Sequence, residues 1–208
     1  MTENELYPLR VTEVTAAAAN EWRVGEALPP FLCESWQIVY VKSGIVEEQT
    51  DNRRELLRSG MIYIHQPNEQ HAMRALGEVP PRVLRVEFEC TGPAMDLFRR
   101  RKTRATTAEM ICLRQLADCA GELFEQPGGV TARPTPRAEP PFAAQQLATL
   151  TVERLLIMIY RRLSRPTRPS PRAVAEQNQA ALVEAVRLYF AANLDKDLKL
   201  EEVCAANE

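Results

Sequence analysis

His65 and His71 are the residues of this chain whose type and spacing point most directly to chemistry. They are the only histidines among 208 residues, and both lie in the segment GMIYIHQPNEQH, from Gly60 to His71. Histidine binds metal ions through its ring nitrogens, and it also forms hydrogen bonds to ligands or to the backbone. Three interpretations therefore remain open: a metal site, polar contacts to a small molecule, or a structural role beside a tight turn.

A metal site at this segment would need further ligands. Zinc and iron sites commonly use about three or four protein ligands, drawn from histidine, cysteine and carboxylates. The additional ligand would have to be Glu47, Glu48 or Glu87. The five cysteines are scattered and form no CxxC pair, so they indicate neither structural zinc nor a disulfide framework. We therefore predict no bound metal, no other cofactor and no catalytic residues.

The segments around the histidines have the character of short strands. Between Glu21 and Cys90, short runs rich in β-branched and aromatic residues alternate with turn residues, as in WQIVYV (Trp36–Val41) and MIYIH (Met61–His65). Strands at such short, regular spacing are typical of an all-β sandwich or small barrel. The sequence therefore predicts a β-barrel over the first ninety or so residues.

The last predicted strand, RVLRVEFEC, alternates strictly between apolar and charged residues. Leu84, Val86 and Phe88 share one face, and the charged residues Arg85, Glu87 and Glu89 share the other. The charged face therefore meets either solvent or a polar cavity inside the barrel.

Candidate ligand-binding residues follow from the way a barrel is built. Alternate residues of each strand line the interior, and small-molecule pockets are mainly apolar with a few convergent polar groups. The candidates are Trp36, Tyr40, Tyr63, His65, His71 and Arg85, with Met73 as a further possibility. Two alternatives stay open, namely that Trp36 and Tyr40 belong to the core and that Arg85 and Glu87 form a surface pair.

Helical periodicity replaces the strand pattern after Gly92-Pro93. The stretch from Thr106 to Glu125 carries apolar residues at spacings of three and four, with Thr107 as a plausible N-cap, and Pro127-Gly128-Gly129 ends it. The following segment, 126–141, is rich in proline and glycine and lacks large apolar residues, so we expect a mobile loop there.

A second helix is predicted from about Phe142 to about Ser164. Its apolar stripe is wide, and a helix with such a stripe needs partners on more than one side. One partner is the barrel or the preceding helix, and the other is a second copy of the chain. The predicted dimer interface consists of Leu155, Met158, Ile159 and Leu163.

The C-terminal part begins with a linker rich in proline, arginine and serine. The predicted boundaries are a barrel with an N-terminal arm over 1–92, a helical pair over 93–165, a linker over 166–178 and a further helical segment over 179–208. The final residues, DKDLKLEEVCAANE, begin another apolar stripe and then stop.

Taken in order, these parts resemble a known family. The motifs W-x-x-V-Y-V-x-S-G (Trp36–Gly44) and G-x-I-Y-I-x-x-P-x-x-x-H (Gly60–His71), followed by a strand ending in Glu87-Phe88, resemble the cupin-like sensor domain of AraC-type transcription regulators. The helical pair matches the hairpin that commonly dimerises in that family. The segment from Ala181 to Glu208 resembles the opening of its helix-turn-helix domain.

The resemblance implies an α+β fold, with a cupin-like β-barrel followed by an antiparallel helical hairpin and a short helical stub. It also implies a homodimer that senses a small-molecule effector, with Arg85 on a strand that lines the pocket. Promoter DNA would be a partner only of a full-length protein, because the chain stops before a recognition helix and its residues after the linker are mainly acidic. The alternative is a metal-dependent cupin enzyme, an isomerase or dioxygenase, although the region corresponding to the first cupin motif lacks the usual HxH pair.

Charge and hydropathy exclude several other classes of protein. With a formal net charge of −2, no overall field draws the chain to nucleic acid or an anionic membrane. The most apolar run, LLIMIY, is far shorter than the ~20 residues of a membrane-spanning helix, and the N-terminus lacks the features of a signal peptide. The basic run RRRKTR (Arg99–Arg104) could contact nucleic acid or direct nuclear targeting, or form a solvated connection between helices. We predict a cytoplasmic protein without membrane contact.

Overall fold

The computed structural model describes residues 6–50, 53–126 and 128–165, together with the single positions 179, 183 and 187. The chain divides into two compact units, Met1–Ser164 and Arg165–Glu208. All the strands of the described residues belong to the first unit. The predicted linker over 166–178 and, apart from those three positions, the predicted helical segment over 179–208 lie outside the described residues.

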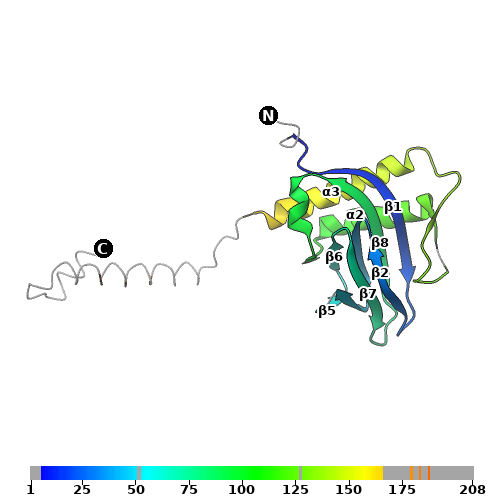
Figure 1. Cartoon of the computed structure of the whole chain (residues 1–208), viewed down its shortest axis with the longest axis horizontal. Coiled ribbons are helices and arrows are strands. Elements are labelled where there is room, and N and C mark those ends of the chain that lie inside the picture. The colour runs from blue at the N-terminus through cyan, green and yellow to red at the C-terminus, as the bar shows by residue number, and fades with distance from the viewer. Residues whose placement is uncertain are drawn as a thin grey trace, which may run out of the picture. The chain divides into compact units, whose positions relative to one another are not determined.

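Two antiparallel sheets form the β part of the first unit (Figure 1). The first sheet has the order β1-β8-β3-β6-β9, and its strands are β1 (Arg10–Glu21), β8 (Arg82–Thr91), β3 (Trp36–Ser43), β6 (Met61–His65) and β9 (Arg101–Arg104). The second sheet has the order β2-β7-β4-β5, and its strands are β2 (Ala27–Cys33), β7 (Glu69–Leu76), β4 (Ile45–Thr50) and β5 (Arg53–Arg58). The two sheets face each other as a cupin-like barrel, which confirms the predicted α+β fold.

The tight turn between β3 and β4 depends on glycine. Gly44 has a φ of 79°, in the left-handed region that other residues rarely adopt. A Cβ atom at this position would lie 2.7 Å from the Cα atom of Pro81. Glycine at position 44 of the sequence motif is therefore required by both the backbone conformation and the close approach of Pro81.

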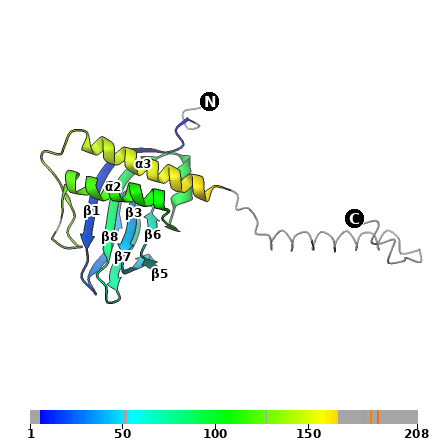
Figure 2. The same cartoon turned by 180° about the vertical axis from the view of Figure 1, so that it is seen from behind.

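Two helices, α2 (Thr107–Leu123) and α3 (Ala144–Leu163), lie side by side across the outer face of the first sheet (Figure 2). Contacts join the start of α2 to the end of α3, so the pair is antiparallel. The N-cap of α2 is Thr106 rather than the expected Thr107. Its side chain accepts a hydrogen bond from the Glu109 backbone while the Glu109 carboxylate accepts one from the Thr106 backbone. This capping box fixes where the helix begins.

The first sheet is buried on both faces, because it lies between the barrel interior and the helices. Along β3, Ile38 and Tyr40 belong to the core shared with the helices, whereas Val39 and Val41 belong to the core inside the barrel. This arrangement explains why WQIVYV is apolar on both faces apart from Gln37, since a strand covered on both faces gains from apolar residues on each of them.

The same packing shows that part of the predicted dimer interface is wrong. Leu155 and Ile159 have no exposed surface, and they pack in the core between α3, α2 and the first sheet. Met158 and Leu163 are partly buried against that core. The stripe on α3 is wide because the helix contacts both α2 and β1 within one chain. The large apolar residues that α3 exposes are instead Leu147, Leu150 and Ile157.

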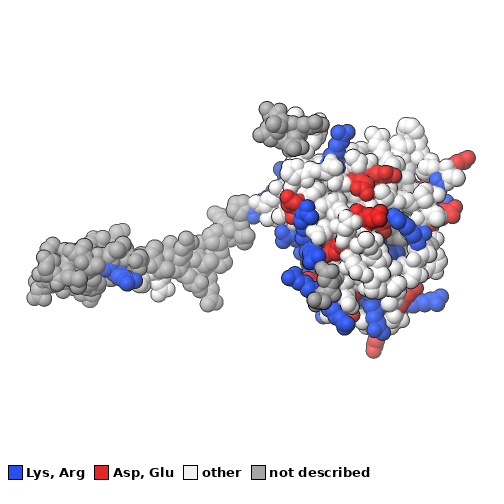
Figure 3. Space-filling view, viewed as in Figure 1, with Lys and Arg blue, Asp and Glu red and all other residues white. Residues whose placement is uncertain are grey.

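The basic run from Arg99 to Arg104 is part of the barrel and not a connection between helices. After the short helix η1 (Pro93–Phe98), β9 pairs with β6 and extends the first sheet beyond the predicted boundary at residue 92. Arg99 forms an ion pair with Asp96, and Lys102 forms one with Glu55. On the face seen in Figure 3, basic and acidic side chains are interspersed.

Two further sequence expectations concern cysteines and membranes. The four cysteines of the first unit, Cys33, Cys90, Cys112 and Cys119, are buried free thiols, and Cys204 lies outside the described residues. The helices within the described part of the chain are all too short or too polar to cross a bilayer.

Candidate functional site

The two histidines lie together inside the barrel. The His65 and His71 rings stack with their centroids 3.8 Å apart and 13° between their planes. His65 lies between two buried carboxylates, with Nδ1 3.1 Å from Glu69 and Nε2 3.3 Å from Glu48. Arg100, the residue before β9, contacts the other oxygen of Glu69 at 2.7 Å. Strands β4, β6 and β7 thus bring two carboxylates and the His65 imidazole together, and Arg100 adds a guanidinium to the cluster.

The pKa values of the two stacked rings are shifted in opposite directions. Burial alone lowers the pKa of His65, but hydrogen bonds and charges from Glu48 and Glu69 outweigh it and raise the pKa above the ordinary value. Burial and the positive charge of His65 lower the pKa of His71 to about 3. A proton therefore binds His65 in preference to His71, because a second buried charge at this distance would have no carboxylate partner.

A chain of polar contacts runs from His71 towards the barrel surface. His71 Nε2 lies 2.9 Å from Gln37 Oε1, and the Gln37 amide nitrogen donates a hydrogen bond of 3.3 Å to Glu87. Because the amide nitrogen is used by Glu87, its oxygen faces His71 Nε2, while His71 Nδ1 lies 3.2 Å from the backbone carbonyl of Glu69, so each ring nitrogen faces an acceptor. Glu87 also accepts a hydrogen bond of 2.8 Å from Arg133, which comes from the segment between the two helices.

This segment belongs to the expected mobile loop over 126–141, and part of it contacts the barrel. Residues 128–134, which we call the seam segment, lie along the barrel, and Val130 is buried in the barrel core. The short strands β10 (Phe124–Glu125) and β11 (Thr135–Pro136) pair at the base of the segment. Composition predicted flexibility because a single valine among prolines and glycines gives no periodic signal.

Arg85 meets the seam segment from inside the barrel. Its Nη2 donates a hydrogen bond of 3.0 Å to the carbonyl oxygen of Val130, and its guanidinium lies 5.8 Å from the centre of the Trp22 ring. The buried Nε atom of Arg85 has no hydrogen-bond partner. Burial lowers the pKa of Arg85 below its ordinary value. A cation is thus held in the barrel with fewer acceptors than its donors can use.

A cavity of about 390 Å³ opens beside Arg85. It lies at the seam, the space between β1 and β2, which are the edge strands of the two sheets. This volume falls within the range of about 300–1,000 Å³ that is usual for small-molecule sites. The residues that matter for its chemistry are Ala17, Leu28, Phe31, Arg85, Glu87 and Arg133. The cavity therefore combines apolar walls with convergent charged groups.

A larger hollow of about 780 Å³ lies outside the barrel, beside α2. Tyr40 and Met110 line it, together with the exposed residues Lys42 and Arg114. The seam cavity is the better candidate for a specific ligand, because its charged groups Arg85 and Glu87 point inward from one strand and are largely shielded from solvent.

The structure separates the predicted site residues into two groups. Tyr63, His65, His71 and Arg85 face the barrel interior, as does Met73. Trp36 and Tyr40 face the helices, so their prediction as lumen residues is wrong. The residues that sequence reasoning did not select are Trp22, Gln37, Val130 and Arg133. Gln37 could have been found, because it alternates with Val39 on the interior face of β3.

The fit of a metal ion can be tested on the same residues. Among the described residues, Glu48, His65 and His71 each offer one ligand atom, and these atoms lie within 4.8 Å of one another. However, both ring nitrogens of His65 already face carboxylates, and His71 Nε2 contacts Gln37. All three residues are almost fully buried. A catalytic metal needs an open coordination position, and this cluster offers a closed one.

This chain resembles known proteins in its structure, and the comparisons of its sequence found no match. No protein-family profile and no curated protein sequence matches the chain. ToxT from Vibrio cholerae, an AraC-family regulator, is similar over 95% of this chain and 69% of its own, with a TM-score of 0.46 and 4% identity. A second structure of ToxT covers 92% of this chain and 70% of its own, with a TM-score of 0.43 and 7% identity.

Other solved structures are similar to a smaller part of this chain. The cupin domain of Cnp3 from Schizosaccharomyces pombe covers 39% of this chain, with a TM-score of 0.33 and 12% identity. KdgF from a Halomonas species covers 38% of this chain, with a TM-score of 0.32 and 19% identity. This chain spans 61% of the length of the Cnp3 domain and 78% of KdgF, but only 46% of the similar AerE from Microcystis aeruginosa.

Proposed function

We propose that this chain is the effector-sensing and dimerisation portion of an AraC-type transcription regulator that acts in the cytoplasm. The observation that carries the proposal is the seam cavity, in which Arg85 and Glu87 converge between apolar walls. The order of sequence motifs from Trp36 to His71, and the helical pair that follows the barrel, support the same function.

An effector in the seam cavity can influence the helices because they share the first sheet. Residues of β8 alternate between the cavity and the helix core, so Arg85 faces the ligand while Val86 packs beneath the helices. On α3, Glu153 accepts a hydrogen bond of 2.9 Å from the Val11 backbone, and Gln145 donates one of 3.1 Å to the Val14 carbonyl. A displacement of β1 or β8 is therefore transmitted to α3 through direct contacts.

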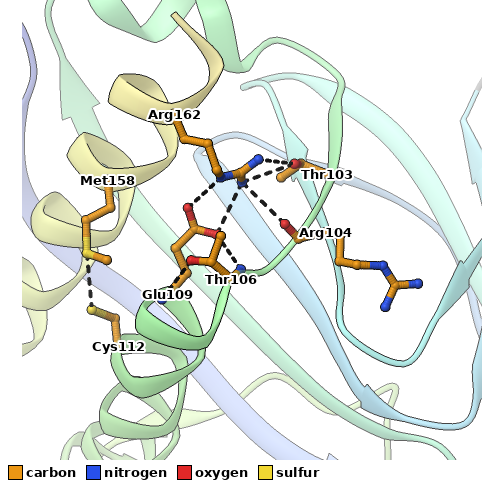
Figure 4. A network of polar contacts seen from close by, with 7 residues as sticks. All are labelled: Thr103, Arg104, Thr106, Glu109, Cys112, Met158 and Arg162. Atoms are coloured by element: carbon orange, nitrogen blue, oxygen red, sulfur yellow. Dashed lines mark hydrogen bonds and ion pairs between the residues drawn. The ribbon is translucent and has the colours of Figure 1, made fainter. Parts of the chain in front are cut away.

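The far end of α3 is fixed to the barrel by an ion-pair network (Figure 4). Arg162 contacts both oxygens of the buried Glu109 carboxylate, at 3.0 and 3.2 Å. The same guanidinium donates to the Thr103 hydroxyl and the Arg104 carbonyl of β9. Since β9 pairs with β6, which carries His65, this network connects the barrel to the last turn of α3, immediately before the predicted linker.

Dimerisation is assigned to the outer face of α3. Leu147, Leu150 and Ile157 are exposed there at spacings of three and seven, which places them along one side of the helix. Large apolar residues gathered in this way are typical of a protein interface. A second copy of the chain, with the same face, is the partner that the family resemblance implies.

Thermal unfolding in the presence of a broad set of small metabolites tests the sensing function. A ligand at about 100 times its dissociation constant stabilises the folded chain by about 2.7 kcal/mol, which raises the unfolding temperature by several degrees. We expect at least one chemical class to give such a shift. A broad set in which every compound leaves the unfolding temperature unchanged would contradict the proposal.

The second candidate is a metal-dependent cupin enzyme, an isomerase or dioxygenase. The cluster of Glu48, His65 and His71 is the observation in its favour, and their contacts with Glu69 and Gln37 argue against it. Elemental analysis of the purified chain separates the two functions. Stoichiometric iron, zinc or manganese that is lost in His65→Asn and His71→Asn would select the enzyme.

A further inference from the structure

The strongest unassigned feature of the molecule is the pairing of Arg85 with the seam segment. Arg85 is the inward-facing cation of the seam cavity, and its hydrogen bond goes to a backbone carbonyl, that of Val130. A carbonyl oxygen carries only a partial charge, and the buried Nε atom is left without an acceptor. Guanidinium groups bind carboxylates more strongly, through two parallel hydrogen bonds. The geometry therefore leaves Arg85 poorly neutralised.

No carboxylate of the described residues forms an ion pair with Arg85. Glu87, two residues away on the same face of β8, favours the charged form of Arg85 through space, but its carboxylate accepts hydrogen bonds from Gln37 and Arg133. Glu34, on the rim of the cavity, is exposed, so solvent screens its charge. The guanidinium of Arg85 therefore still has donors to offer a carboxylate in the cavity. Ala17, Leu28 and Phe31 supply an apolar surface beside it.

The seam segment is weakly held at its tip and firmly held at its base. At the tip, the contacts are the buried Val130 side chain, the Arg85 hydrogen bond and the ion pair of Glu87 with the largely exposed Arg133. At the base, β10 pairs with β11, and Arg137 donates a hydrogen bond of 2.8 Å to the Gly121 carbonyl. The tip can therefore leave the barrel while α2 and α3 remain in place.

We propose that the seam segment is a resident plug, and that the effector is a small monocarboxylate with an apolar body. In this proposal the carbonyl oxygen of Val130 occupies the position of a carboxylate oxygen of the effector, and the Val130 side chain occupies part of the space for its apolar body. The effector displaces the plug and pairs with Arg85. The inference rests on the proposed sensing function. It adds the chemical class of the effector and names the seam segment as the part of the chain that competes with the effector for Arg85.

Matched acids and amides test the chemical class. Benzoate is compared with benzamide, and hexanoate with hexanamide, by calorimetric titration of the wild-type chain. Each amide keeps the size of its acid and removes the charge, so we expect the acids to bind at least about tenfold more tightly. Equal affinity of acid and amide, or no binding by either acid, overturns the proposal.

Two substitutions with opposite expected effects on the affinity for acids test whether the seam segment and the effector compete for Arg85. Arg85→Met should remove the preference for acids, with Arg82→Met, an exposed position on the same strand, as the control. Val130→Ala weakens the plug and should tighten binding of the acids about three- to tenfold, because less of the free protein is closed. Val79→Ala, at an exposed valine, is the matched control. If Val130→Ala binds the acids with unchanged or lower affinity, the assignment of the seam segment as a plug is wrong.

The outcome remains decisive if Arg85→Met does not fold. The comparison of acids with amides and the Val130→Ala titration both use chains with Arg85 intact. If the acids fail while neutral metabolites stabilise the chain in the broad thermal screen, this inference is wrong and the sensing function stands. If no compound in the broad screen stabilises the chain, the sensing function fails as well.

Discussion

His65 and His71 show how two identical side chains in contact acquire opposite roles. Glu48 and Glu69 face the two nitrogens of His65 and raise its pKa. The pKa of His71 is lowered to about 3 by burial and by the positive charges of His65 and Arg85, which outweigh the Glu69 carbonyl at Nδ1. Burial penalises charge at both positions, and only the carboxylates at His65 outweigh that penalty.

Opposite pKa shifts predict opposite dependences of stability on pH. The raised pKa of His65 gives stability that is complete below about 6.5 and is lost as pH rises through its value in the folded protein. The lowered pKa of His71, about 3, gives stability that is complete above about 6.5 and is lost as pH falls towards 3. For His71 the slope approaches about 1.4 kcal/mol per pH unit.

Urea unfolding of the wild type and His71→Asn between pH 4 and 8 measures this effect. We expect the difference in unfolding free energy between the two chains to shrink as pH falls below about 6.5, because the variant lacks the group that resists protonation. His65→Asn should behave differently, since it leaves Glu48 and Glu69 without their buried cation and is destabilised throughout the range. Parallel curves for the wild type and His71→Asn would contradict the assigned charge states.

The sequence predicted which residues share a strand face most clearly where the two faces of the strand differ chemically. On β8, the alternation of Val86 with Arg85 and Glu87 separated the helix core from the barrel interior. From Trp36 to Val41 in β3 every position is apolar or neutral, so period-two alternation showed that Trp36 and Tyr40 share a face without showing which one. The contacts of Val130 and Arg133 depend on the path that the segment between α2 and α3 takes along the barrel. The spacing of residues in the sequence does not reveal that path.

Among the secondary-structure elements, α3 packs on the barrel with one face and carries the proposed dimer interface on the other. Its inner positions pack on α2 and β1, and its outer face exposes Leu147 and Leu150. The sequence located both helices to within about two residues, because their apolar periodicity is strong. It could not divide the wide stripe of α3 into inner and outer faces, because both faces are rich in leucine and isoleucine.

Charged substitutions on α3 distinguish the two faces. The double variant Leu147→Glu and Leu150→Glu should sediment as a folded monomer at concentrations where the wild type is a dimer, because exposed charges disrupt only an interface. Leu155→Glu should unfold the chain, since it places an unpaired charge in the core. Sedimentation and circular dichroism give the two readouts. A wild type that is monomeric at high micromolar concentration would contradict the dimer.

The Arg162 network is the second feature that belongs to α3. Arg162→Met leaves the Glu109 carboxylate buried without its cation, which should lower the free energy of unfolding by about 1–3 kcal/mol, given that Arg162 is partly exposed. Arg161→Met, one residue earlier and exposed, should change it by less than about 0.5 kcal/mol. Chemical denaturation compares the variants. Equal stability of the two would show that the network does not fix the end of the helix.

In the molecule as a whole, the barrel is a pair of sheets with an open edge. The edge strands β1 and β2 border a cavity, and the segment between the helices covers it with one buried valine and two polar contacts. From Arg133 the contacts continue through Glu87, Gln37 and His71 to the charged cluster around His65. A ligand at the seam would therefore meet both the helical connection and the polar interior of the barrel.

Hydrogen exchange of the wild-type chain, with and without the compound that gives the largest thermal shift, tests most directly whether the seam is the effector site. We predict that changes in amide protection concentrate in β1, β2 and β8, with loss of protection in residues 128–133 as the seam segment is displaced. Changes confined to the hollow beside α2, with the seam strands unaffected, would contradict this assignment.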